Sequence, residues 1–137
     1  MSRSPGLASA AFRFALRGLA VFPLSPGAKV PLPGSHGCCD GLTDADAVRA
    51  RWAKHPRANI GVATGSRSGI WVLDVDPGGD RTLAELEAEH GLLPSTIEAV
   101  TPRGGRHLYW RWLEEGSQIR NSAGRIGPGL DVRGEGG

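Results

Sequence analysis

The stretch Gly69-Ile-Trp-Val-Leu-Asp-Val-Asp76 decides how this chain folds and where its chemistry lies. Its first part is short, apolar and rich in β-branched and aromatic residues, with turn residues on both sides, which is typical of a buried strand. Because side chains alternate along a strand, Asp74 and Asp76 leave the same face, about 6.5–7 Å apart along the backbone. Two such carboxylates repel each other unless a cation lies between them. The motif predicts a divalent metal site for phosphoryl or nucleotidyl transfer, although a strand that runs into an acidic turn fits this motif equally well.

Composition indicates one globular domain over residues 1–137, of which 39% are hydrophobic and 22% charged. No apolar run approaches the ~20 residues of a membrane span, and the N-terminus lacks the apolar region of a signal peptide. We therefore expect a cytoplasmic protein without a membrane partner. The net charge of +2 gives no overall basic field. Lys29 and Lys54 are the only lysines, so the other fourteen cations are arginines, which favour forked contacts to phosphate or carboxylate.

The two cysteines, Cys38 and Cys39, are adjacent in sequence. No C-x-x-C spacing occurs, and neighbouring cysteines rarely pair with each other, so reduced structural thiols in a loop are expected. His36 lies two residues earlier, which leaves a His/Cys/Cys metal site as the alternative.

Periodicity and turn residues predict an α+β fold around one mixed or antiparallel sheet. Thr43 with Asp46 and Thr82 with Glu85 resemble helix-capping pairs. The expected helices span residues 8–17, about 45–55 and 82–90, and the expected strands span residues 19–24, 59–63, 70–74, 97–101, 107–112 and 130–132.

A Gly104-Gly105 turn precedes a strand that begins with His107. Alternation places His107, Tyr109 and Arg111 on one face of this strand and apolar side chains on the other. If this strand is a neighbour of the Asp74 strand, His107 can point where the two aspartates point. Glycines let backbone N–H groups approach phosphate oxygens, and a histidine can donate to the same group. The alternative is an ordinary hairpin turn with an exposed histidine.

A third carboxylate, Asp131, lies on a short glycine-bounded strand, with Arg133 two residues later on the same face. Three acidic ligands would complete an oxygen-rich site for Mg²⁺ or Mn²⁺, and an arginine beside them could neutralise a triphosphate. A surface ion pair is the alternative. Lys29 is either a phosphate contact or a solvated side chain, and Thr64-Gly-Ser66 resembles a phosphate-binding turn without P-loop spacing.

Taken in order, these segments resemble the N-terminal domain of the bifunctional DNA primase/polymerase (prim-pol) family. That family belongs to the archaeo-eukaryotic primase superfamily and occurs in replication proteins of phages, plasmids and other mobile elements. The most specific matching segments are Pro56-x-Ala-Asn-Ile-Gly-Val-Ala-Thr-Gly65, Ser68-Gly-Ile-x-Val-Leu-Asp-Val-Asp-Pro77, Thr101-Pro-x-Gly-Gly-x-His-Leu-Tyr109 and Gly127-Pro-Gly-Leu-Asp-Val-Arg-Gly134.

The resemblance implies an RRM-like sheet with helices packed against it and a template-directed nucleotidyltransferase with a two-metal mechanism. Its substrates would be ribonucleoside or deoxyribonucleoside triphosphates and a single-stranded DNA template, with Mg²⁺ or Mn²⁺ as cofactor and a helicase as a further partner. The implied catalytic and metal-binding residues are Asp74, Asp76 and Asp131. The implied or candidate nucleotide ligands are His107, Arg133, Lys29, Gly104 and Gly105. Arg120 and Arg125 are candidates for contact with the template backbone.

The sequence departs from the family at Arg103, which replaces a commonly small residue, and after Gly137, where the family continues into a further strand. We therefore expect a fragment that lacks one or more C-terminal strands. Two alternatives remain open. One is a non-catalytic, truncated remnant that binds nucleotide or DNA. The other is a phosphatase of the haloacid dehalogenase type, which is disfavoured because its chemistry needs a downstream lysine and none follows Lys54.

Overall fold

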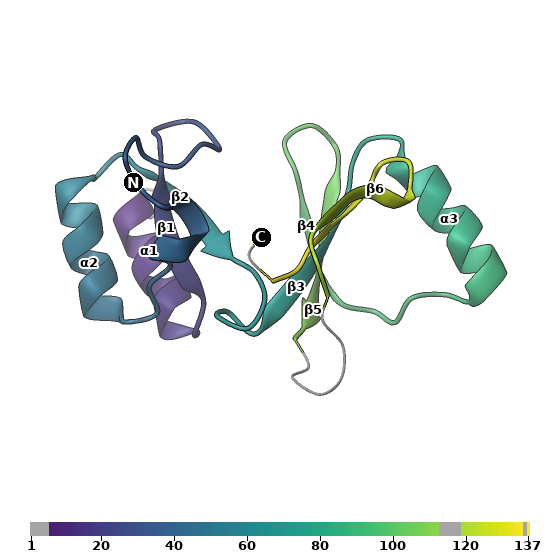
Figure 1. Cartoon of the computed structure of the whole chain (residues 1–137), viewed down its shortest axis with the longest axis horizontal. Coiled ribbons are helices and arrows are strands. Elements are labelled where there is room, and N and C mark those ends of the chain that lie inside the picture. Colours follow the sequence, from purple (N-terminus) through teal and green to yellow (C-terminus); the bar gives the residue numbers. More distant parts are fainter. Residues whose placement is uncertain (1–5, 113–118, 136) are drawn as a thin grey trace, which may run out of the picture. The chain divides into compact units, whose positions relative to one another are not determined.

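The computed structural model describes residues 6–112, 119–135 and 137. In these residues the chain is α+β, with three α-helices and two antiparallel sheets, which confirms the predicted fold class. Contacts divide the chain into two compact units, Met1–Ala63 and Thr64–Gly137, each with its own hydrophobic core (Figure 1). Among the helices that the structure describes, none combines the length and the apolar character that a bilayer-spanning segment needs.

The first unit combines two helices with a two-stranded sheet. Its elements are α1 (Leu7–Leu16), β1 (Ala20–Leu24), the 3-10 helix η1 (Gly37–Asp40), α2 (Ala45–Lys54) and β2 (Asn59–Ala63). β1 and β2 pair antiparallel over their whole length. The loop between β1 and η1 is irregular because its prolines lack backbone donors and its glycines break both the helix and the strand period.

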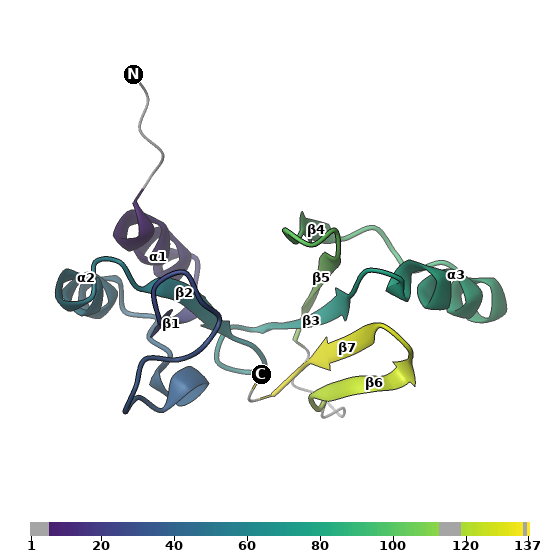
Figure 2. The same ribbon diagram turned by 90° about the horizontal axis from the view of Figure 1, so that it is seen from above.

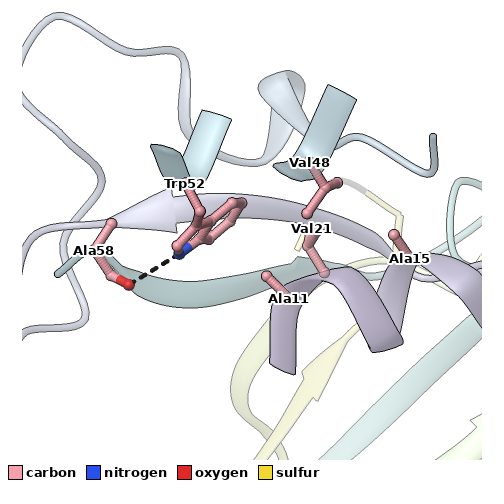
Figure 3. Packing of buried hydrophobic residues seen from close by; sticks show 6 residues of the cluster. All are labelled: Ala11, Ala15, Val21, Val48, Trp52 and Ala58. Atoms are coloured by element: carbon pink, nitrogen blue, oxygen red, sulfur yellow. Dashed lines mark hydrogen bonds between the residues drawn. The ribbon is translucent and has the colours of Figure 1, made fainter. Parts of the chain in front are cut away.

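Trp52 is the largest fully buried side chain of the first unit. Its indole Nε1 donates a hydrogen bond to the backbone oxygen of Ala58 at 3.1 Å (Figure 3). The other buried residues of this cluster come from α1, β1 and α2 and are Ala11, Ala15, Val21 and Val48. Small side chains on α1 leave room for the indole in the core of this unit. The buried indole N–H keeps a hydrogen-bond partner, so it is buried without an unpaired donor.

Two helices begin at residues other than those expected from the sequence. The carboxylate of Asp44, not the hydroxyl of Thr43, caps α2 by accepting from two backbone N–H groups of the first turn. α3 (Gly79–His90) begins three residues before Thr82, because Gly78 adopts a φ of 92° and turns the chain directly into the helix. Thr82 therefore lies inside α3 rather than at its cap.

The second unit is a five-stranded antiparallel sheet with α3. Its strands are β3 (Ile70–Val75), β4 (Ile97–Val100), β5 (Arg106–Arg111), β6 (Ser122–Gly127) and β7 (Leu130–Arg133). The order across the sheet is β4-β5-β3-β7-β6 (Figure 2). The expectation of a single sheet is wrong, since in the described residues β1 and β2 form a two-stranded sheet separate from the five-stranded one. β6 is a further strand that the sequence did not predict, because its two glycines and few apolar residues hide the strand period.

One face of the central strand β3 is apolar. Leu73 lies opposite Leu108 of β5 and opposite Val132 of β7, and all three are buried together with Leu83 of α3. Since side chains alternate along β3, the next residue points to the other face of the sheet. Burial of the apolar face thus fixes which polar residues of β3 share the opposite face.

The segment after β7 is held from two sides. Thr64 Oγ1 donates to the backbone oxygen of Gly134 at 2.6 Å, and Ser66 donates to the Glu135 carboxylate from its N–H at 3.0 Å and its hydroxyl at 2.8 Å. Asn121 Oδ1 accepts the N–H of Gly134 at 2.7 Å. The two donors of Ser66 hold the pKa of Glu135 below its ordinary value. The turn that resembles a phosphate-binding turn in sequence therefore binds a carboxylate of the chain itself.

Replacing Thr64 with valine tests how much its hydrogen bond to Gly134 stabilises the folded chain. Thr64 is 7% exposed, so Thr64→Val leaves a buried carbonyl of Gly134 without its hydroxyl donor. We expect the free energy of unfolding to fall by about 1–2 kcal/mol, as measured by urea denaturation. The exposed Thr43, changed to valine, is the matched control and should alter it by less than about 0.5 kcal/mol. Equal losses of unfolding free energy in the two variants would contradict a stabilising role for the Thr64–Gly134 hydrogen bond.

Candidate functional site

Three aspartates from the ends of β3 and β7 form an acidic group. Asp74 lies opposite Asp131 in the antiparallel register, so both side chains leave the same face, and Asp76 follows two residues after Asp74. Each offers one carboxylate oxygen, and these oxygens all lie within 4.8 Å of one another. In residues 6–112, 119–135 and 137, no other set of three or more His, Cys, Asp or Glu side chains is grouped in this way. Such oxygen donors suit Mg²⁺ or Mn²⁺.

Hydrogen bonds from backbone N–H groups hold two of the three aspartates in place. The N–H of Asp76 donates to the backbone oxygen of Gly129 at 2.9 Å. A Cβ on Gly79 would collide with this same carbonyl, so glycine at that position permits the close approach of the α3 start to the β6–β7 turn. Gly124 of β6 donates its N–H to Asp131 Oδ1 at 3.0 Å. Sequence reasoning identified the glycines that bound the Asp131 strand but missed the roles of Gly79 and Gly124, although the Gly78-Gly79 pair marks the turn before α3.

His107 and Arg133 lie at the edges of the acidic group. His107 of β5 is opposite Asp74 in the register, and its Nε2 is 3.5 Å from Asp74 Oδ1. A guanidinium nitrogen of Arg133 is 4.0 Å from Asp131 Oδ2. The side chains of His107 and Arg133 are 38% and 51% exposed, so both can meet a molecule from solvent. The structure thus brings together five of the residues singled out in the sequence.

Burial raises the pKa of Asp74, whose side chain is only 17% exposed. His107 acts in the opposite direction, while the charge of Asp76 raises the pKa further; the smaller effects of Arg133 and Asp131 oppose each other. Tyr109 lies two residues after His107 on the same face, and burial followed by the charge of Asp74 raises its pKa as well. In the absence of a cation, the ionised form of Asp74 is therefore less favourable than that of a solvent-exposed aspartate.

The variant Asp74→Asn should stabilise the metal-free chain. The folded-state pKa of Asp74 is raised above its ordinary value of 3.8. The protonated side chain therefore contributes stability below pH 3.8, and this contribution is lost as the pH rises through the folded-state pKa. At pH 7 the neutral amide removes the cost of burying the Asp74 charge and its repulsion with Asp76, so we expect the free energy of unfolding to rise by about 1 kcal/mol in EDTA. Urea denaturation at pH 7 and pH 4 measures this, and the difference should shrink at pH 4. A variant less stable than wild type at pH 7 would contradict the electrostatic account of Asp74.

Gly104 and Gly105 form the turn between β4 and β5, but both N–H groups are engaged within it. Gly104 donates to the backbone oxygen of Thr101 at 3.0 Å, and Gly105 donates to Thr101 Oγ1 at 2.9 Å. A Cβ on Gly105 would lie 2.7 Å from the backbone oxygen of Val75, so glycine is needed for the turn to pack against the end of β3. Contact of these glycines with phosphate stays a prediction.

The remaining predicted residues lie outside the acidic group. Lys29 belongs to the loop after β1 in the first unit, so its contact with phosphate stays a prediction. Arg120 precedes β6, and Arg125 is an exposed residue of β6. Contact of these two arginines with a template also stays a prediction.

Cys38 and Cys39 lie in the short helix η1. Together with His36 they do not form a metal-holding group, because the described part of the chain contains only the group of three aspartates. The His/Cys/Cys alternative therefore finds no support in the structure.

Comparison with known proteins assigns this chain to a family. A comparison with curated proteins finds no significant match. The family model described as bifunctional DNA primase/polymerase, N-terminal, matches residues 11–137, a span that includes the acidic group, His107 and Arg133. Because the match covers most of the chain, the resemblance read from the sequence is confirmed, and the chain belongs to the bifunctional DNA primase/polymerase family.

Proposed function

We propose that this chain is a DNA primase/polymerase that joins nucleotides in the order set by a single-stranded DNA template. Membership of the family supports nucleotidyl transfer and DNA and nucleotide substrates. The observation that carries the proposal is the acidic group, whose oxygens lie within 4.8 Å of one another, with His107 and Arg133 beside it on one face of the sheet. A nucleoside triphosphate bound as its metal complex requires this pairing of acidic ligands with phosphate-binding cations.

The acidic group suits a resident Mg²⁺ or Mn²⁺. Its donors are three hard carboxylate oxygens, and two of the three carboxylates, those of Asp76 and Asp131, raise the pKa of Asp74 through their charge, a repulsion that a bound cation would relieve. The bound metal would lower the pKa of the attacking 3′-hydroxyl and neutralise the pyrophosphate leaving group. Asp74, Asp76 and Asp131 would hold it from β3 and β7.

His107 and Arg133 would bind the triphosphate from opposite sides of β3, because their strands β5 and β7 flank that strand. The guanidinium of Arg133 can form a forked contact with phosphate oxygens, and the half-exposed side chain is open to solvent. The imidazole of His107 can donate to a neighbouring phosphate oxygen. Both contacts orient the triphosphate, so that the reacting phosphorus faces the 3′-hydroxyl.

Primer synthesis and primer extension on single-stranded DNA test the proposal. We expect labelled product with Mg²⁺ or Mn²⁺, none in EDTA, and none from Asp131→Asn. Glu85→Gln, an exposed change on α3 that also removes one negative charge, should leave the yield unchanged. Absence of product from a folded wild-type chain at any metal concentration would overturn the proposal. If nucleotide binding persisted in that case, a non-catalytic nucleotide-binding domain would be the better assignment.

A further inference from the structure

The two units differ in charge. Residues 1–63 contain eight Lys or Arg and three Asp or Glu, a net charge of +5. Residues 64–137 contain eight Lys or Arg and eleven Asp or Glu, a net charge of −3. The near-neutral sum over the chain hides this separation. Two of the three acidic residues of the first unit, Asp44 and Asp46, lie at the start of α2, where they stabilise the helix N-terminus. The rest of the helix pair is rich in arginine.

Three exposed arginines belong to this helix pair: Arg13 of α1, Arg17 directly after α1 and Arg49 of α2. The two helices lie side by side (Figures 1 and 2). Arg13 and Arg49 line one hollow of about 300 Å³, and Arg13 and Arg17 line a second of about 220 Å³. Arg13 borders both hollows and so connects them. We call Arg13, Arg17 and Arg49 the arginine strip.

The arginine strip is available to an anion. Within the described residues, no carboxylate lies within ion-pair distance of any of its members. The guanidinium of Arg49 stands 4.3 Å from the centre of the Phe12 ring, a cation–π contact that orients it at the first hollow. The same hollow is lined by Ser9, whose hydroxyl is a further hydrogen-bond donor.

We propose that the arginine strip binds the phosphate backbone of single-stranded nucleic acid and serves as a template-binding surface. Guanidinium groups bind phosphate oxygens in forked pairs, and several of them in a row suit a repeating chain of phosphates better than a single anion. No base-reading pocket is needed, because backbone contacts hold a strand without regard to its sequence. The assignment of that strand as template rests on the proposed function; binding of the phosphate chain does not.

Fluorescence anisotropy with a dye-labelled oligothymidine tests the proposal on the whole chain, in EDTA and without nucleotide. We expect Arg13→Ala/Arg17→Ala to weaken binding by about tenfold or more at low salt. The slope of log affinity against log salt should become shallower by about 1.4, since each lost single-strand phosphate contact removes about 0.7. Arg57→Ala/Arg81→Ala removes the same charge away from both hollows and should retain nearly the wild-type affinity and slope.

Unchanged affinity and slope in Arg13→Ala/Arg17→Ala would overturn the proposal. So would loss of binding to vesicles containing phosphatidylserine with no change in oligothymidine binding, because the strip would then recognise an anionic lipid surface. Mn²⁺ binding by the acidic group, followed by electron paramagnetic resonance, separates this inference from the proposed function. Arginine-dependent DNA binding without primer synthesis would refute only the proposed catalysis, whereas synthesis that persists with arginine-independent DNA binding would refute only the arginine strip.

Discussion

The variant Asp74→Asn/Asp76→Asn is expected to lose template-directed nucleotide incorporation by at least about a thousandfold. It removes two of the three carboxylates whose oxygens lie within 4.8 Å of one another. A catalytic metal contributes several kcal/mol of transition-state stabilisation, and about 4 kcal/mol corresponds to a thousandfold in rate. Single-turnover incorporation into a primed template measures the loss, and Mn²⁺ binding by electron paramagnetic resonance should disappear with it.

A matched control separates this effect from a change in overall charge. Glu85→Gln/Glu89→Gln also removes two negative charges, but both side chains lie exposed on α3. This control should retain the wild-type rate and Mn²⁺ binding. Wild-type incorporation by a folded Asp74→Asn/Asp76→Asn variant would show that the acidic group is not the metal centre.

The variant Trp52→Ala is expected to lower the free energy of unfolding by about 3–5 kcal/mol, the usual cost of truncating a buried aromatic side chain. The indole is fully buried, and its removal also leaves the Ala58 carbonyl without its donor. A loss of this size is a large part of the ~5–15 kcal/mol that stabilises a typical domain. Thermal unfolding followed by circular dichroism measures it.

Trp52→Phe provides the comparison for this prediction. It keeps most of the buried ring area but still leaves the Ala58 carbonyl unpaired, so its cost should be smaller, about 1–3 kcal/mol. If Trp52→Ala unfolded at the same temperature as wild type, the indole could not be the centre of the first unit's core.

The sequence allowed prediction of those elements in which one local signal dominates. The apolar run before Asp74 gave β3, and strand alternation placed His107 and Tyr109 on one face, opposite to Leu108. The grouping of Asp74 with Asp131 followed from the family resemblance and needs only that β3 and β7 be neighbours, which they are.

Long-range features could not be predicted in this way. Alternation within a strand does not say which strand it pairs with, so the division into two sheets was missed. The strand β6 is too rich in glycine to show a period, and the approach of Gly79 to Gly129 joins residues fifty positions apart. Likewise, no local pattern showed that Thr101 would engage the N–H groups of Gly104 and Gly105.

The most direct test of the proposed metal centre is a crystal structure of the chain with Mn²⁺ and a non-hydrolysable nucleoside triphosphate, with anomalous scattering recorded at the manganese edge. The proposed function predicts anomalous density among the carboxylates of Asp74, Asp76 and Asp131, with the triphosphate against His107 and Arg133. Density confined to other parts of the chain, with a nucleotide bound away from this face of the sheet, would contradict it.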